Sequence, residues 1–195
     1  MRRRLRILAS SIARKLWARK IRRITSSFRE HTNYDEDAWV YLKKFGKKGA
    51  CYTPTDYSFF RNYGWGRSSI FPSIYTDGMY SIIFTKEQEF VNEPLACISF
   101  DIMGPRTVVI RQIQGVKDKA HELRHWRWEK MLVSLVVEWA QENNFAVVKI
   151  VSAENNGWQH KMPLQMLKLR YDVTAQRLGF KLDPGTGNYY KRIPA

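Results

Sequence analysis

The chain has 195 residues, 44% of them hydrophobic, so it is long and apolar enough to fold around a core and is not a disordered chain. Its formal net charge is +15, and eleven of its 33 basic residues lie within residues 1–29, which contain no Asp or Glu. No apolar run approaches the roughly 18 residues of a membrane-spanning helix, and the N-terminus lacks the continuous apolar segment of a secretory signal.

The first segment, residues 1–28, has the pattern of a cationic helix with two apolar stripes. One stripe consists of Leu5, Leu8, Ile12 and Leu16, and the other of Trp17, Ile21, Ile24 and Phe28. At about 100° per residue the stripes fall on nearly opposite sides. We therefore expect either a break near Leu16 or two packing partners, and we predict residues 1–32 to be a basic helical arm separate from a domain at 33–195.

The basic composition of this arm, residues 1–29, suits a polyanionic partner. We expect this partner to be a nucleic acid or the ribosome rather than an anionic membrane surface. Alternatively, the helix docks on its own domain and exposes a solvated basic face. The arm is also Arg- and Ser-rich like an organelle transit peptide, so a cytoplasmic location is expected with organelle targeting as the alternative. Cys51 and Cys97 belong to no metal-ligand motif, which favours reduced thiols.

Residues 35–45 are predicted to be a short helix, because acidic residues open it, two lysines close it and Gly46 follows. Residues 50–80 contain nine aromatic rings interrupted by Gly and Pro, so we expect irregular structure there. Rings beside Arg61 and Arg67 either stack on bases or a substrate, or simply pack.

The next elements alternate between strands and helices. Three strands at residues 80–84, 95–102 and 107–114 should form an antiparallel meander, since Asn92-Glu-Pro94 and Gly104-Pro105 lie in the joins. A helix follows from Trp128 until Asn143, then a strand at 145–151, a helix at 164–178 and a hairpin formed by 180–182 and 189–193. A helix between two strands of one sheet favours a parallel pair. The prediction is an α/β (α+β) fold with a mixed, mostly antiparallel sheet.

This order of elements over residues 79–193 resembles the GNAT acyltransferase superfamily, with Leu178-Gly-Phe180 and the terminal Tyr189-Tyr-Lys191 strand as the best local matches. The resemblance implies helices on both faces and a parallel central pair that splays apart. It also implies that acetyl-CoA or another acyl-CoA binds in the splay, opposite an acceptor amine.

The resemblance also implies site residues. The strand end Ile113, Gln114 and Gly115 would hold the acyl donor by main-chain hydrogen bonds. Residues 124–129 stand where the superfamily has a glycine-rich phosphate loop, and here Arg124, Arg127 and Trp128 would contact the donor. Ala175 stands where the superfamily tends to place a tyrosine, and Tyr171, one turn earlier, is the substitute.

Titratable side chains expected near the sheet's centre are Asp101, Glu122, Glu154 and Tyr171. Glu122 or Glu154 would deprotonate the amine, directly or through water.

A second motif, His121-Glu-Leu-Arg-His125, matches the zinc-protease pattern His-Glu-x-x-His. Glu142, Glu154 and His160 are the candidate third ligands. The alternatives are two solvent-facing histidines, or an acid/base role for Glu122 or His125 within the acyltransferase frame.

Three functions follow from these motifs. The first is acyl transfer, with acetyl the expected group, to an amine that possibly belongs to a nucleic-acid-associated or ribosomal substrate. The second is a catalytically inactive RNA- or ribosome-binding protein. The third is a zinc hydrolase that uses His121 and His125. The acceptor and the oligomeric state do not follow from the sequence.

Overall fold

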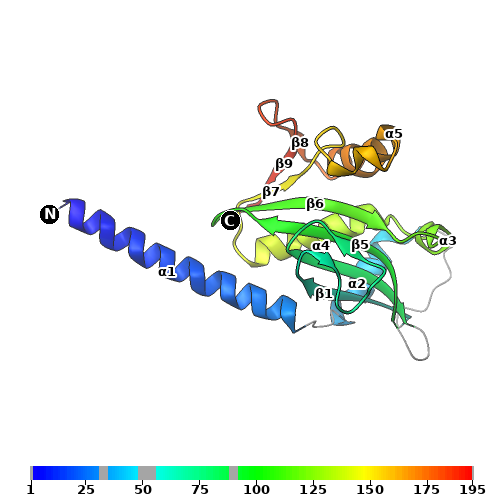
Figure 1. Ribbon diagram of the computed structural model, residues 1–195, viewed down its shortest axis with the longest axis horizontal. Coiled ribbons are helices and arrows are strands. Elements are labelled where there is room, and N and C mark those ends of the chain that lie inside the picture. Colours follow the sequence, from blue (N-terminus) through cyan, green and yellow to red (C-terminus); the bar gives the residue numbers. More distant parts are fainter. Residues whose placement is uncertain (1, 31–34, 48–55, 88–91, 195) are drawn as a thin grey trace.

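The computed structural model describes residues 2–30, 35–47, 56–87 and 92–194 (Figure 1), and the side chains of residues 2–11 and 35–39 are not part of that description. Cys51 therefore lies outside the described residues. Within the described part, no helix has the combination of length and apolarity that a membrane span requires.

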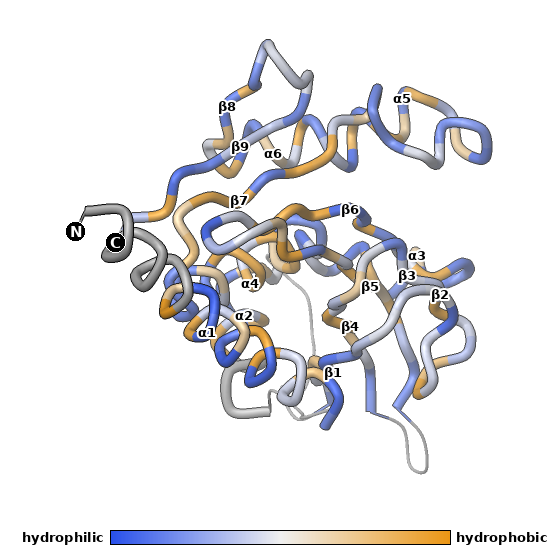
Figure 2. The backbone as a smooth tube through the Cα atoms, turned by 60° about the vertical axis from the view of Figure 1, so that its left-hand side comes forward, coloured by the Kyte–Doolittle hydropathy of each residue, from blue (hydrophilic) through white to orange (hydrophobic). Residues whose placement is uncertain are grey.

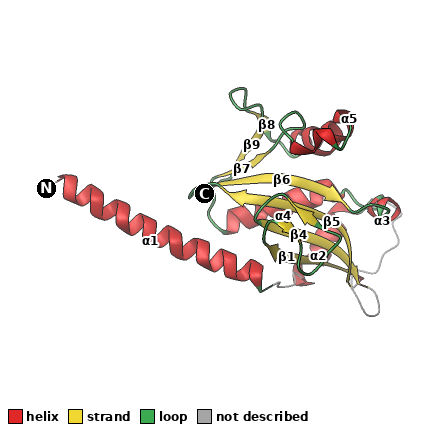
Figure 3. Cartoon of the chain, viewed as in Figure 1, coloured by secondary structure: helices red, strands yellow, loops and turns green. Residues whose placement is uncertain are grey.

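A seven-stranded sheet forms the centre of the fold, in the order β1-β4-β5-β6-β7-β9-β8 (Figure 3). Its strands are β1 Tyr57–Tyr63, β4 Tyr80–Glu87, β5 Asn92–Ile102, β6 Thr107–Gly115, β7 Val147–Ile150, β8 Lys181–Leu182 and β9 Tyr189–Arg192. β6 and β7 are parallel, and every other neighbouring pair is antiparallel. The predicted mixed α/β sheet with a parallel central pair is confirmed.

Helices lie on both sides of this sheet. They are α1 Arg2–Arg29, α2 Asp35–Phe45, α3 Ala120–Leu123, α4 Trp128–Glu142, α5 Leu164–Leu167 and α6 Val173–Arg177. A 3-10 turn, η2 (Gly157–His160), precedes α5, and a π-helical turn, η3 (Lys168–Asp172), joins α5 to α6. Figures 1 and 2 show α4 on one side of β6 and β7 and the α5–α6 segment on the other.

The core lies between the strands and helices α1, α2 and α4. Figure 2 shows hydrophobic stretches gathered in α4 and the central strands. Phe28 at the end of α1 is fully buried, and its ring meets Tyr80, Phe100 and Trp139 edge-on with centroids 5.2 to 5.8 Å apart. Edge-to-face pairs at this separation add to the stabilisation from burial. The C-terminal end of α1 is therefore part of the core.

The predicted break near Leu16 is wrong, because α1 is one continuous helix that contains neither Gly nor Pro. Among the side chains that the structure describes, Trp17, Ile24 and Phe28 pack on the domain and Ile12 and Leu16 lie in solvent, so no break is needed. The N-terminal half of α1 projects past the sheet (Figure 1).

The expectation of irregular structure over residues 50–80 is wrong for β1, which pairs with β4 along its whole length. Phe59 faces the main core and Phe60 faces a second apolar cluster with Phe71. Rings on both faces remove the alternation of apolar and polar residues that marks a strand. A separate two-stranded hairpin, β2 Gly66–Arg67 and β3 Tyr75–Thr76, follows β1.

Asn92-Glu-Pro94 was expected in a loop, but these residues begin β5. The β4–β5 register shifts between Phe84 and Thr85, beside the pair Thr85–Pro94. A bulge is one of the places where a sheet tolerates proline, which has no N–H to donate.

Candidate active site

The parallel strands β6 and β7 separate where the candidate site begins. They pair from Thr107 with Val147 to Ile110 with Ile150, and the last contact is the Val151 N–H donating to the Ile110 carbonyl at 3.1 Å. Residues 111–115 of β6 then continue without a partner on the β7 side. The expected splay is thus present.

A bulge in β6 accompanies the separation. Ser99 of β5 pairs with Gln112 and Phe100 pairs with Ile110, so Arg111 is an extra residue in β6. A bulge of this kind reverses the direction of the side chains that follow. Ile113 accordingly joins the same core as Ile110.

Tyr171 fills the point where the strands part. Its hydroxyl accepts a hydrogen bond from the Ile113 N–H at 3.0 Å, and its ring is 2% exposed. The residue lies in the π-helical turn η3, and π-turns frequently occur at functional sites. Burial raises the pKa of the Tyr171 hydroxyl above its ordinary value, although the Ile113 hydrogen bond opposes this. The hydroxyl is therefore protonated at neutral pH.

Two cavities meet near this tyrosine. The first, which we call the splay cavity, has a volume of about 280 Å³ and is lined by Gln112, Ile113, Gln114, Gly115, Lys117, Trp158, Met162, Leu167, Arg170 and Tyr171. The second, the aromatic cavity, has a volume of about 470 Å³ and is lined by Trp65, Tyr75, Asp77, Arg111, Val151, Asn155, Asn156, Gly157, Trp158, His160 and Lys161. Trp158 lines both cavities, so they are neighbours.

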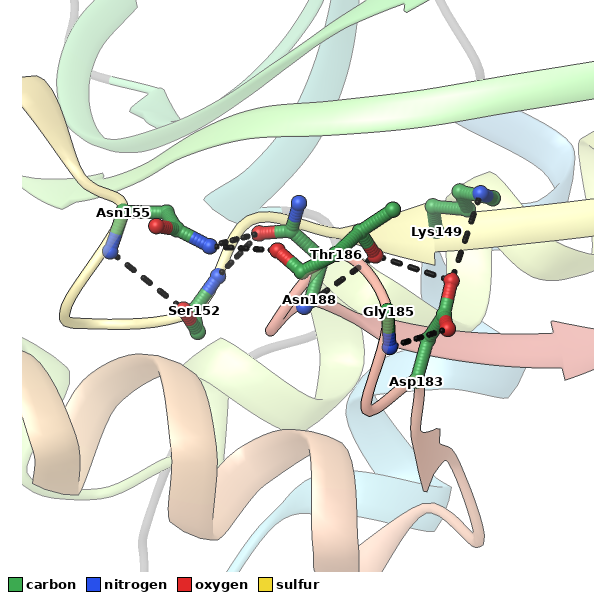
Figure 4. Close-up of polar contacts among 7 residues, drawn as sticks. All are labelled: Lys149, Ser152, Asn155, Asp183, Gly185, Thr186 and Asn188. Atoms are coloured by element: carbon green, nitrogen blue, oxygen red, sulfur yellow. Dashed lines mark hydrogen bonds and ion pairs between the residues drawn. The ribbon is translucent and has the colours of Figure 1, made fainter.

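The loop after β7 is held in place by the hairpin between β8 and β9 (Figure 4). Asn188 Oδ1 accepts hydrogen bonds from the Ser152 N–H and from Asn155 Nδ2, each at 3.1 Å. Asp183 organises the hairpin itself by accepting from the Gly185 N–H and the Thr186 hydroxyl. These contacts fix the wall that carries Asn155 to Trp158 into the aromatic cavity.

The N-terminus of α4 is close-packed. A Cβ added to Gly115 would lie 3.0 Å from Leu123 Cδ1 and 3.5 Å from Trp128, so β6 ends directly against this helix start. The Arg170 guanidinium lies 5.5 Å from the Trp128 ring centroid, a cation–π contact, and burial raises the pKa of Glu129. Large side chains thus occupy the helix end where the superfamily has glycines.

The structure brings together part of the predicted donor site. Ile113, Gln114 and Gly115 line the splay cavity together with Tyr171. Arg124 and Arg127 do not line it and are exposed, and Trp128 is buried beside Gly115. The cations that line the cavity are Lys117 and Arg170, which the sequence reasoning missed.

The predicted carboxylates lie elsewhere. Glu122 forms an ion pair with Lys86 at 2.9 Å, which lowers the pKa of Glu122. Glu154 is exposed and 3.4 Å from Lys168. Asp101 pairs with Arg111 at 3.0 Å. None of these carboxylates lines either cavity, whereas Asp77, which was not predicted, lines the aromatic one.

The zinc motif does not assemble a site in the described residues. Helix α3 ends at Leu123, so His125 lies beyond the helix that was expected to carry both imidazoles on one face. No group of three His, Cys, Asp or Glu residues within the described ranges is arranged to hold a metal ion.

No protein-family model matches the chain, and no curated protein matches it in sequence. Among solved structures it is similar to the GNAT family N-acetyltransferase YhbS from Escherichia coli in complex with CoA, at 13% identity over 58% of this chain and 58% of that one, with a TM-score of 0.37. It is also similar to a GNAT family acetyltransferase from Staphylococcus aureus (10% identity, 58% and 68% covered, TM-score 0.40) and to Ard1 from Thermoplasma volcanium (10% identity, 59% and 71% covered, TM-score 0.37).

The match to YhbS spans less than two thirds of that chain. Because the TM-scores lie below 0.5, these similarities do not establish a shared activity. The solved structures named here include GNAT proteins, the superfamily that the sequence resembles.

Proposed function

We propose that this protein is an acyltransferase that binds an acyl-CoA in the splay cavity and transfers the acyl group to an amine held in the aromatic cavity. The observation that carries this proposal is the Ile113 N–H, a main-chain donor at the strand separation whose partner is a side-chain hydroxyl rather than another strand. Such an N–H can donate a hydrogen bond to a substrate oxygen once Tyr171 moves aside.

The residues of the splay cavity fit the donor. Met162, Leu167 and the Trp158 ring offer an apolar lining for a pantetheine arm, and Lys117 and Arg170 offer cations for phosphate oxygens. The compact α4 N-terminus, with Trp128 and Glu129, implies that side chains rather than helix N–H groups make the phosphate contacts.

The chemical step would use the chain's residues as follows. The amine nitrogen forms a bond to the acyl carbon while the thioester C–S bond breaks. The Ile113 N–H stabilises negative charge on the carbonyl oxygen, and the Tyr171 hydroxyl donates its proton to the departing sulfur. Asp77, the carboxylate of the aromatic cavity, takes the proton that the nitrogen loses. Solvent then returns a proton to Tyr171 and removes the one on Asp77.

Calorimetric titration with acetyl-CoA tests the donor site. The wild-type chain should bind, and Met162→Trp, which places a bulky ring in the splay cavity, should weaken binding at least tenfold. Met166→Trp is the matched control, because Met166 is 50% exposed in the same segment and lines neither cavity. A folded wild-type protein that shows no heat at millimolar acetyl-CoA would refute the proposal.

The projecting helix α1 favours a second candidate function, the binding of RNA or another polyanion. Its side chains at Lys15, Arg19, Arg22 and Arg23 are exposed, and no acidic residue occurs within the helix. Cations spaced along an exposed helix attract a phosphate backbone. This function is compatible with acyl transfer and also with a protein that has lost catalysis, which the acetyl-CoA titration distinguishes.

Changing Arg19, Arg22 and Arg23 together to Gln tests the arm without disturbing Phe28. RNA affinity should fall at least tenfold. The slope of log affinity against log salt concentration should become less steep by about 0.7 per lost phosphate contact. Lys43→Gln is the control, since Lys43 is exposed and belongs to a different helix, α2. Unchanged RNA affinity, or binding to anionic vesicles but not to RNA, would contradict this assignment.

A further inference from the structure

The aromatic cavity has a hydrophobic rim that the core does not use. Trp65 is 68% exposed and Tyr75 is 41% exposed, and their rings meet edge-on with centroids 6.1 Å apart. Trp65 directly precedes β2 and Tyr75 is the first residue of β3, and Trp158 lines the same cavity from the loop after β7. Exposed rings that border a cavity of ligand size offer planar faces for stacking.

The floor of the cavity carries fixed polar groups. Trp158 Nε1 donates to Asp77 Oδ2, and the Asp77 N–H donates to Gln112 Oε1 at 3.0 Å. Asn156 is 4% exposed, and its Oδ1 accepts from the Trp158 N–H at 2.9 Å. Its Nδ2 is buried, and its hydrogen bond to the Tyr171 hydroxyl opposes the rise in the pKa of that tyrosine. The Asn156 amide therefore connects the aromatic cavity to Tyr171 of the splay cavity.

The charged side chains of the aromatic cavity favour an anionic ligand over a cationic one. His160 and Lys161 line the cavity together with the carboxylate of Asp77, and Arg111, which also lines it, pairs with Asp101 at 3.0 Å. Lys161 Nζ already lies 4.9 Å from the centroid of the Trp158 ring. A ligand whose only charge is an ammonium would therefore have to displace Lys161 from the Trp158 ring. A planar ring that carries an anionic group can stack on the aromatic side chains and pair with the cations at the same time.

We infer that the aromatic cavity is the acceptor subsite and that it takes an aminated nucleobase with its phosphate, either as a free nucleotide or within a single-stranded nucleic acid. This inference rests on the proposed acyltransferase function. The rings stack on the base, and Lys161 and His160 meet the phosphate. The exocyclic amine is the nucleophile of the transfer described above, so the same bonds form and break.

Binding of cytidine monophosphate to the full chain tests the subsite, with acetyl-pantetheine as the donor probe because it contains no nucleotide. The double change Trp65→Ala with Tyr75→Ala should weaken cytidine monophosphate binding about tenfold or more. It should leave acetyl-pantetheine binding unchanged. Met103→Ala, at a residue that is 54% exposed and outside both cavities, is the control.

The product gives a second readout. Mass spectrometry should find an acetyl group on the cytosine amine after incubation with acetyl-CoA, and none on uridine monophosphate, which has no exocyclic amine. A cytidine-containing oligonucleotide that binds more than tenfold tighter than the mononucleotide identifies a nucleic-acid source, whereas equal affinities identify the free nucleotide.

Two outcomes would overturn the inference. If cytidine monophosphate does not bind while acetyl-pantetheine does, the acceptor assignment fails and the proposed acyl transfer stands. If acetyl-CoA displaces cytidine monophosphate and acetyl-pantetheine does not, the cavity holds the nucleotide of the donor rather than the acceptor. Failure of acetyl-pantetheine and acetyl-CoA to bind at all would instead reject the proposed function.

Discussion

The Tyr171 hydroxyl accepts a hydrogen bond from the Ile113 N–H that the proposed reaction needs, and under that proposal it would also protonate the leaving sulfur. Tyr171→Phe should therefore lower kcat about a hundredfold, within the range of general acid catalysis, while acetyl-CoA binds at least as tightly as before. Single-turnover kinetics and calorimetry separate these quantities. Tyr190→Phe, at a residue that lines neither cavity, should change neither value, and an unchanged kcat in Tyr171→Phe would exclude the tyrosine as the acid.

Cys97 is fully buried on β5, and burial raises the pKa of its thiol to about 12. In a Cys51→Ser background, the native protein should resist a thiol reagent at pH 8 and react once denatured, as a spectrophotometric thiol assay can measure. Because the folded state holds this proton more tightly than the unfolded one, unfolding free energy should fall as the pH rises from about 9 towards 12. Rapid labelling of the native protein would contradict the burial.

Which side chains meet at the site was only partly predictable. Ile113 and Gly115, at the end of a predicted strand, and Tyr171, one turn before Ala175, were expected from the resemblance to the superfamily, and all three line the splay cavity. Glu122 could not be placed, because its ion pair depends on Lys86 from a strand 36 residues away. The cations Lys117 and Arg170 come from segments that only the folded chain brings together.

At the level of elements, α1 has two halves with different roles. Phe28 packs against three rings of the core, whereas Leu16 is 58% exposed on the same helix. Phe28→Ala should lower the unfolding free energy by about 3–5 kcal/mol, and Leu16→Ala should change it by less than about 0.5 kcal/mol. Urea denaturation followed by tryptophan fluorescence measures both. Equal effects of the two substitutions would show that α1 does not dock as described.

Element order was predictable because each helix and strand after Tyr80 has a clear period and a clear end. The segment before Tyr80 was not predictable in this way. The rings of β1 face two apolar clusters, one on each side of the strand, so apolar and polar residues do not alternate along it. The sequence also could not reveal that Ile12 and Leu16 of α1 stay in solvent. An apolar stripe on a helix shows which side chains can pack. Whether they do pack depends on whether the domain extends far enough along the helix to cover them.

Across the whole molecule, the charge distribution predicts a salt dependence of stability. The net charge is +15, and the cations of α1 are spaced along one helix without an acidic residue between them, so they repel one another. Raising KCl from about 20 to about 200 mM should shorten the screening length and raise the Tm, as scanning calorimetry can record. The variant with Arg19, Arg22 and Arg23 changed to Gln should respond less. A Tm that falls with added KCl would contradict this account.

The single extra residue at Arg111 has a consequence for how this sheet could be altered. Val108 and Ile110 turn into the core before it, and Ile113 does so after it, so the odd and even positions exchange roles at that residue. Deleting Arg111 would leave Gln112 opposite Ser99 and Ile113 opposite Ile98, so the isoleucine would stay in the core. The deletion would remove the Arg111–Asp101 ion pair and one cation of the aromatic cavity. The extra residue thus adds a guanidinium group where the two parallel strands part, without turning the core side chains on either side of it.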